Sequence, residues 1–178
     1  MITAELEPAI KMLPFNHPLH LASHQFLVEE AYVQDRRDFD TWLSMMTADV
    51  TYRVPVTSTL GGNPHKQGEM DHLSEDLYSL KMRVARLKTN LAWTENPASR
   101  TRHYITNVCT YPTERPNEAR VLSALLVFRT QGDYQGPDII AGMRDDILRR
   151  EGEVMRLARR VVTLDESVLK TQNLAIFL

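Results

Sequence analysis

The chain has 178 residues, of which 43% are hydrophobic and 25% are charged, which fits one soluble globular domain with a full hydrophobic core. The formal net charge of -2 gives no reason to expect a nucleic acid or an anionic membrane as partner, and the single Cys109 excludes an internal disulfide. No apolar run reaches the roughly 18 residues of a membrane span and no basic, apolar leader opens the chain, so we expect a cytoplasmic protein.

The first half of the chain carries helical patterns. Residues 1–16 lack periodicity and are interpreted as an extended N-terminal arm. Pro18 suits the first turn of a helix, which apolar residues at three- and four-residue spacing continue to about residue 36. Asp38 can cap a short second helix, and an apolar stripe over residues 71–89 predicts a third.

Strand patterns begin between the second and third helices. Residues 50–56 are β-rich and predict a first strand, in which Pro55 favours an edge position because proline cannot donate to a ladder. Residues 57–68 hold three glycines and a proline and predict a mobile loop. After the third helix the apolar period changes to two, and four further strands are expected over residues 102–112, 119–130, 138–149 and 155–164.

The order of these elements predicts the fold class. Helices first and strands afterwards indicate an α+β domain spanning residues 1–178, with the helices on one face of a curved sheet. Short links between the strands favour a largely antiparallel meander. The strand at 119–130 is apolar on both faces, so we expect it to be central and covered on both sides. The apolar tail, residues 171–178, either docks on its own sheet or joins an interface, and we favour docking.

No metal or cofactor site is expected in this chain. His17, His20 and His24 have a spacing that places them on one helical face, but no carboxylate joins them, so a helix cap and polar surface residues are the favoured interpretation. His65 and His72 straddle a loop. The glycine-rich phosphate-binding and nucleophile-elbow motifs are missing from the sequence.

One set of side chains allows acid–base chemistry. A cone of helices on a curved sheet, as in ketosteroid isomerases and scytalone dehydratases, can hold a pocket in which Tyr32, Asp35, Tyr52 and His103 converge. The alternative to that pocket is tyrosines that fill the core and a hydrogen-bonded strand histidine. A free-standing dehydratase or isomerase using Tyr32, Asp35 and His103 is therefore one hypothesis, and a small binding module of the same fold is another.

Four segments of the chain carry a resemblance to a known family. Residues 93–103 read Trp-x-Glu-x-Pro-x-Ser-Arg-x-Arg-His, and residues 142–149 read Gly-x-Arg-x-Asp-x-Leu-Arg. With residues 159–165 and the ending at 173–178, these motifs resemble the small (β) subunits of aromatic-ring-hydroxylating dioxygenases over nearly the whole chain.

The resemblance implies a fold, partners and a division of labour. Such subunits have a cystatin-like or nuclear-transport-factor-like cone and assemble as three α and three β chains. The α subunit carries a Rieske [2Fe-2S] cluster and a mononuclear Fe(II), receives NAD(P)H electrons through reductase and ferredoxin, and adds both atoms of O2 to an aromatic ring. The resemblance thus implies a non-catalytic structural β subunit for the catabolism of aromatic hydrocarbons or acids, with no catalytic, cofactor or metal residue of its own.

Arginines of the second half suggest where partners bind. An arginine-rich surface suits a subunit interface, because the planar guanidinium pairs with carboxylates and carbonyls. Residue chemistry and position in the family motifs lead us to expect interface or structural roles for Trp93, Asn96, Arg100, Arg102, Arg144 and Arg149.

Overall fold

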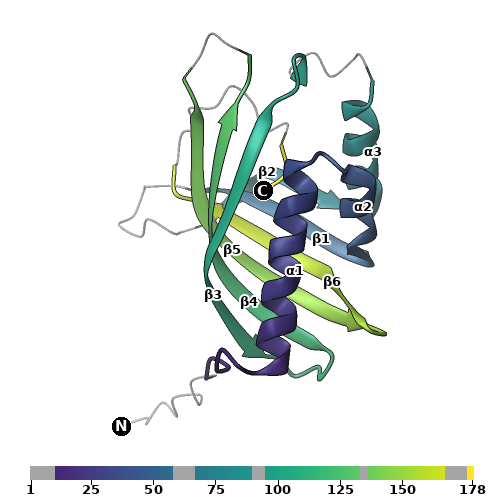
Figure 1. Ribbon diagram of the computed structural model, residues 1–178, viewed down its shortest axis with the longest axis vertical. Helices are drawn as coiled ribbons and strands as arrows, with labels where there is room; N and C mark the ends of the chain where they lie inside the picture. Colours follow the sequence, from purple (N-terminus) through teal and green to yellow (C-terminus); the bar gives the residue numbers. More distant parts are fainter. Residues whose placement is uncertain (1–10, 58–66, 90–94, 133–135, 167–175) are drawn as a thin grey trace.

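The computed structural model describes residues 11–57, 67–89, 95–132, 136–166 and 176–178. A curved six-stranded sheet carries the long helix across one face, and the two shorter helices lie near one end of it (Figure 1). The helices are α1 (Pro18–Asp35), α2 (Phe39–Ser44) and α3 (Leu77–Leu87). The strands are β1 (Met46–Thr57), β2 (Gln67–Asp76), β3 (Arg100–Pro112), β4 (Glu118–Thr130), β5 (Asp138–Glu151) and β6 (Val154–Leu164). The α+β class is confirmed.

The sheet has the order β2-β1-β6-β5-β4-β3. Strands β3 to β6 form the expected antiparallel meander, whereas β1 pairs in parallel with β6 and antiparallel with β2. Gly142 lies where β5 and β6 approach closely, since a Cβ there would lie 2.5 Å from the backbone oxygen of Thr163. This explains why the motif at 142–149 begins with glycine.

The predicted third helix is wrong over its first part. Residues 71–76 belong to β2, which pairs with β1 from Thr51 opposite Asp76 onwards. The helix starts only after Asp76, whose side chain accepts a hydrogen bond from Ser79 N (2.8 Å) in a capping box. The capping signal therefore marks the true boundary between strand and helix.

The structure also differs from two predictions, for the position of Pro55 in the sheet and for the bounds of the loop at 57–68. Pro55 lies in an inner strand between β2 and β6, at a shift of register in the β1–β2 ladder. Such an irregularity accommodates the missing proline N–H, so the predicted edge position is wrong. Of the predicted loop, residues 57, 67 and 68 are strand residues, and 58–66 lie outside the described residues.

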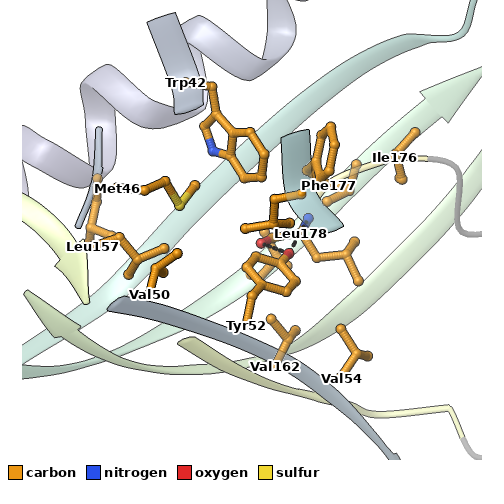
Figure 2. Packing of buried hydrophobic residues seen from close by; sticks show 14 of the residues in the cluster. Trp42, Met46, Val50, Tyr52, Val54, Leu157, Val162, Ile176, Phe177 and Leu178 are labelled. Carbon is orange, nitrogen blue, oxygen red and sulfur yellow. Dashed lines mark hydrogen bonds between the residues drawn. The ribbon is translucent and has the colours of Figure 1, made fainter. Parts of the chain in front are cut away.

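The core lies between α1, α2 and the inner face of the sheet. Trp42, Tyr52 and Phe177 form its aromatic centre, with the Trp42 and Phe177 rings 4.1 Å apart (Figure 2). Ile176, Phe177 and Leu178 are all buried here. The described end of the tail thus docks in the chain's own core, as expected, while 171–175 lie outside the described residues.

The first two helices and the N-terminal arm complete the description of the fold. The predicted first two helices are confirmed, with His17 and Asp38 as their N-caps. Of the expected arm, residues 1–10 lie outside the described part, and Leu13 N donates to Thr110 O of β3 (2.8 Å). No helix in the described ranges is long and apolar enough to cross a membrane.

Strand β4 lies inside the sheet, between β5 and the edge strand β3, but it is not covered on both faces. Its inner side chains, such as Val121, Leu125 and Val127, are buried, whereas Leu126 and Phe128 on the outer face are 40% and 37% exposed. The prediction of double coverage is therefore wrong within this chain.

Candidate functional site

Charged side chains occupy the interior of the cone. Glu30 lies on the buried stripe of α1, and Arg144, Asp146 and Arg160 point inward from β5 and β6. Each of the four is fully buried. Their positions follow from ordinary periodicity: Arg144 and Asp146 are two residues apart on β5, and Asp146 pairs with Arg160 across the β5–β6 ladder.

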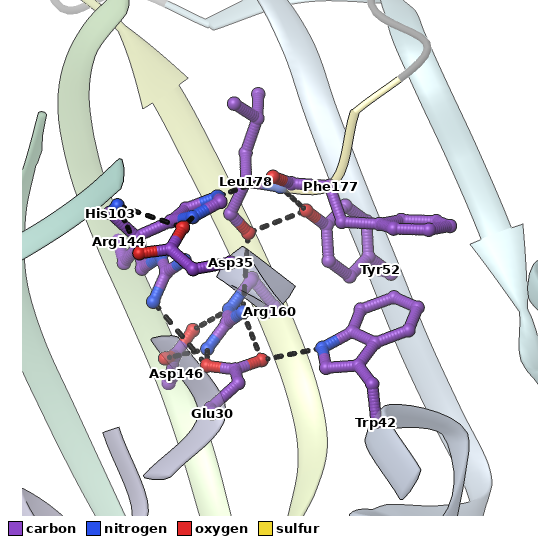
Figure 3. Close-up of polar contacts among 10 residues, drawn as sticks. All are labelled: Glu30, Asp35, Trp42, Tyr52, His103, Arg144, Asp146, Arg160, Phe177 and Leu178. Carbon is purple, nitrogen blue, oxygen red and sulfur yellow. Dashed lines mark hydrogen bonds and ion pairs between the residues drawn. The ribbon is translucent and has the colours of Figure 1, made fainter. Parts of the chain in front are cut away.

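Arg160 is the centre of this cluster (Figure 3). It binds Asp146 through Nε (2.9 Å) and Nη2 (2.8 Å), and Glu30 through Nη1 (2.7 Å) and Nη2 (2.7 Å). Its Nη1 also donates to Leu178 O (3.2 Å), and Trp42 Nε1 donates to Glu30 (3.0 Å). All five N–H donors of Arg160 thus have acceptors, which is what a buried guanidinium requires.

The electrostatics of the cluster favour its charged form. Burial alone raises the pKa of Glu30, but Arg160 and Arg144 outweigh burial and bring that pKa down to about 2. Asp146 and Glu30 hold the pKa of Arg160 well above its ordinary value against the effect of burial, whereas burial and the charge of Arg160 lower the pKa of Arg144. The pKa values of Glu30 and Arg160 therefore both move in the direction that favours their ion pair.

Arg144 is less completely bound than Arg160. Its Nη1 reaches Glu30 at 3.4 Å, but its Nε and Nη2 have no hydrogen-bond partner among the residues that the structure describes. The same holds for the Gln34 amide and the Ser123 hydroxyl, and Ser123 pairs with Arg144 across β4 and β5. Buried polar atoms without a protein partner are the groups that buried water molecules commonly bind.

The Tyr52 hydroxyl ties the last residues to the sheet. It donates to Leu178 O (2.6 Å) and accepts from Leu178 N (2.8 Å), and burial raises its pKa. Figure 2 shows Leu178 beside Tyr52, and Figure 3 shows its carbonyl oxygen bound to both Tyr52 and Arg160. Leu178 and the charged cluster thus occupy the space around the Tyr52 hydroxyl.

The predicted acid–base residues come together only in part. His103 Nδ1 lies 2.6 Å from Asp35 Oδ1, and His103 Nε2 lies 2.9 Å from Phe177 O. Both ring nitrogens therefore already have partners within the chain. Tyr32 is 70% exposed, and Tyr52 binds Leu178. Tyr32, Asp35 and His103 nevertheless line one groove of about 600 Å³ between α1 and β3.

Glu95 organises the corner that carries the motif at 93–103. Its buried carboxylate accepts from Ser99 Oγ (2.8 Å), Arg37 Nη1 (3.0 Å) and Arg129 Nη2 (2.9 Å). The Asn96–Pro97 peptide bond in this corner is cis. Glu95 and Ser99 of the motif thus join the end of α1 to the start of β3 and to β4, while Trp93 lies outside the described residues.

The arginines predicted for interfaces occupy different environments. Asn96, Arg100 and Arg102 are exposed, and their interface role stays a prediction. Arg149 bridges Asp49 (2.8 Å) and Glu118 (2.8 Å) within the chain. Arg144 is fully buried, so of its two expected roles the structural one fits its position.

The histidine series on α1 has structural contacts. His17 caps the helix by accepting from Leu19 N (3.1 Å), and His20 Nδ1 lies 3.0 Å from Thr110 Oγ1. Burial, followed by the charges of His24 and His17, lowers the pKa of His20. Within the described ranges no group of three His, Cys, Asp or Glu side chains is placed to hold a metal ion.

Sequence reasoning missed most of the residues that hold the interior together. Glu30 sits on the apolar stripe of α1, and a carboxylate there is a signal for a buried partner. Arg129, Asp146 and Arg160 fall on inward positions of strands, which the strand alternation alone could have shown. Their partners could not be named, because Glu30 and Arg160 are 130 residues apart.

The fold and these contacts define a cone-fold protein whose interior is filled by its own side chains. The model of the ring hydroxylating beta subunit family matches residues 29–171. The biphenyl 2,3-dioxygenase subunit beta of Rhodococcus jostii (strain RHA1) is 33% identical over 174 residues, which cover 94% of this chain and 92% of the relative. The chain therefore belongs to the ring-hydroxylating β subunit family and is a β subunit of aromatic-ring dioxygenases.

Solved structures agree with this assignment. A structure of naphthalene 1,2-dioxygenase with indole bound in the active site aligns with a TM-score of 0.79 at 27% identity, covering 92% of this chain and 89% of that chain. A protein of Novosphingobium aromaticivorans DSM 12444 assigned as a scytalone dehydratase aligns with a TM-score of 0.60 at 14% identity, covering 81% and 82%. The second likeness shows the fold alone.

Proposed function

We propose that this chain is the structural β subunit of a bacterial multicomponent dioxygenase and assembles with an α subunit that carries the Rieske cluster and the mononuclear iron. One cysteine cannot supply the two cysteine ligands of a Rieske cluster, so the cluster does not fit this chain. The observation that carries the structural role is the filled interior, in which Arg160, Glu30, Tyr52 and Leu178 satisfy one another.

We further propose the composition of the whole complex and the reaction that it catalyses. Three α and three β chains assemble, ferredoxin and reductase deliver NAD(P)H electrons to the α subunit, and both atoms of O2 enter an aromatic ring. Support comes from the relatives, of which one is named for biphenyl and one for naphthalene. The β chain contributes assembly and stability.

Native mass spectrometry with iron analysis tests this function. The chain is purified from its native host, and an assembly with equal numbers of this chain and of a larger, iron-bearing chain is expected. A species that contains this chain alone, without iron and without dioxygenase activity on any aromatic hydrocarbon when mixed with host extract, contradicts the proposal.

The contact between Asp35 and His103 beside a groove of about 600 Å³ favours a second candidate, a free-standing dehydratase or isomerase. For this function His103 Nε2 must first leave Phe177 O. Dehydration of a hydroxylated polycycle by the lone chain would support it if the activity is lost in His103→Ala, reduced in Tyr32→Phe and kept in Tyr78→Phe. Tyr32, Asp35 and His103 line the same groove, whereas Tyr78 is an exposed residue of α3.

A further inference from the structure

His103 of β3 lies where α1, the sheet and the docked end of the tail meet (Figure 3). Its side chain is 2% exposed, and each ring nitrogen contacts an oxygen. Nδ1 lies 2.6 Å from Asp35 Oδ1 at the end of α1, and Nε2 lies 2.9 Å from Phe177 O. One imidazole thus joins α1 to residues 176–178, although Phe177 is 74 residues further along the chain.

The two oxygens that contact the ring are both acceptors. A backbone carbonyl has no hydrogen to donate. The Asp35 carboxylate also accepts from the backbone N–H of His103 (3.2 Å) and from Thr101 Oγ1 (3.2 Å), as an ionised group does. A neutral imidazole has one N–H and one bare nitrogen, so it can donate to only one of the two oxygens. Both contacts are hydrogen bonds only when each ring nitrogen carries a proton.

The neighbouring charges leave Asp35 available to His103. The other cation beside Asp35 is Arg102, which is farther away (3.8 Å) and 67% exposed. The short separation between Nδ1 and Oδ1 agrees with a charge-assisted hydrogen bond. Other titratable or charged side chains near the ring or the docked tail are Tyr32, Arg36, Arg37, Tyr52, Arg83, Tyr104, Arg144 and Arg160.

Four arginines of that set have carboxylates of their own. The pairs are Arg37 with Glu95 (3.0 Å), Arg83 with Glu75 (3.3 Å), Arg144 with Glu30 (3.4 Å), and Arg160 with Glu30 (2.7 Å) and Asp146 (2.8 Å). The positive charges around the tail are therefore largely balanced without Asp35, and a positive charge on the His103 ring is paired with the Asp35 carboxylate.

We propose that His103, protonated on both ring nitrogens, attaches residues 176–178 to α1 and β3 and loosens them when it loses one proton. The carboxylate of Asp35 is the stronger acceptor, so it keeps the remaining N–H. The lone pair of Nε2 then faces the lone pairs of Phe177 O, and this contact is lost. The attachment therefore weakens as the pH rises.

The attached residues complete two parts of the interior. The Phe177 ring lies 4.1 Å from the Trp42 ring, and Leu178 O accepts from Arg160 and from Tyr52. A change at the His103 ring therefore affects both the aromatic centre of the core and the buried ion pairs.

Nitrogen NMR of the full chain, labelled at its histidines, measures the protonation of the His103 ring. Hydrogen exchange of the Leu178 amide, which donates to Tyr52, measures the attachment of the tail. We expect both ring nitrogens to be protonated while the tail is attached. The protection factor of the amide should fall roughly tenfold in the pH range in which the ring loses one proton. An attached tail beside a ring with a bare Nε2, or a protection factor that does not respond to the loss of the proton, contradicts the proposal.

Asp35→Asn changes the number of protons that the contact needs. The asparagine Nδ2 can donate to a bare Nδ1 while its oxygen accepts from the backbone N–H of His103, so a neutral ring satisfies both of its neighbours. We expect the tail to stay protected without the fall at higher pH. Asp40→Asn, which removes an exposed carboxylate paired with Lys88 (2.6 Å), should keep the fall. The same pH response in both variants would show that the pair of Asp35 and His103 does not control the tail.

His103→Ala removes the contact at every pH. The protection factor should be roughly tenfold lower than in the unaltered chain at acidic pH and should show no further fall as the pH rises. His24→Ala, at an exposed position of α1, should behave like the unaltered chain. Circular dichroism shows whether each variant is folded, and if His103→Ala is not, Asp35→Asn decides. A folded His103→Ala chain with a tail as protected as that of His24→Ala overturns the proposal.

Discussion

Each face of the sheet carries some side chains that are unusual for their surroundings. The inner face buries Arg144, Asp146 and Arg160, whereas the outer face exposes Leu126 and Phe128. Buried ion pairs contribute less to stability than apolar packing would. They favour the observed position of α1 on the sheet, because moving α1 would leave Glu30 and Arg160 buried without each other. Apolar side chains outside stabilise the chain little until a partner covers them. The sheet thus has buried ion pairs on its inner face and exposed apolar side chains on its outer face.

Removal of Arg160 is the strongest test of the inner face. Arg160→Leu leaves Glu30 and Asp146 buried without their main cation, so we expect a loss of about 3–5 kcal/mol in the free energy of unfolding, measured by urea denaturation. Arg150→Leu, at an exposed position, should change it by less than about 0.5 kcal/mol. Equal losses for the two variants would show that the cluster does not hold the interior.

Acid should act on the same cluster. The pKa of Glu30 is depressed from 4.5 to about 2 in the folded chain, so its contribution is complete above pH 4.5 and is lost as the pH falls from 4.5 through 2. The expected loss is on the order of 3 kcal/mol. Asp49, whose hydrogen bonds from Arg149 also lower its pKa to about 2, adds to the slope.

Urea denaturation at several acidic pH values measures this loss. Glu30→Gln should remove part of the pH dependence between 4.5 and 2, and Phe128→Ser, on the outer face, should leave it unchanged. A Glu30→Gln chain with the full slope would mean that other carboxylates carry the acid sensitivity.

The Tyr52 hydroxyl should have a smaller effect. Tyr52→Phe removes a donor to Leu178 O and an acceptor for Leu178 N, both buried, and should cost about 1–2 kcal/mol in thermal or urea unfolding. Tyr32→Phe changes an exposed hydroxyl and serves as the control, with an expected effect below about 0.5 kcal/mol. A Tyr52→Phe chain as stable as the unaltered one would show that the hydrogen bonds between Tyr52 and Leu178 contribute little to the free energy of unfolding.

The smallest expected effect is that of Leu126→Ala, and the neighbouring Leu125 on β4 serves as its reference. Leu126→Ala, on the outer face, should change the unfolding free energy of the isolated chain by less than about 1 kcal/mol, since the side chain is already 40% exposed. Leu125→Ala, 2% exposed on the inner face, should cost about 2–5 kcal/mol. Similar costs for the two would remove the distinction between the faces.

The sequence predicted the regular elements well where their signals were local. His17-Pro18 and Asp38 marked the starts of α1 and α2, and period-two apolar residues marked the last four strands. Strand β2 was missed because Leu73 is its one large, partly buried apolar residue facing the core, and that leucine also fits the stripe of the following helix. A single residue that satisfies both periods cannot decide between them.

The site was harder to predict than the fold. The motif at 93–103 was recognised, but the role of Glu95 depends on Arg37 and Arg129, which arrive from α1 and β4. Arg144 was taken for a surface residue, because arginine is mostly exposed and its burial depends on Glu30, 114 residues away. Ion pairs between distant segments leave no local pattern in a sequence.

The parallel pairing of β1 with β6 has a consequence for the order in which the chain can fold during synthesis. Met46 pairs with Leu157, so β1 leaves the ribosome 111 residues before its neighbour. At about 5–20 residues per second this interval is roughly 5–20 s, during which one side of β1 and the Glu30 side of α1 lack their partners. The nascent chain therefore cannot complete this part of its core until β6 has been made.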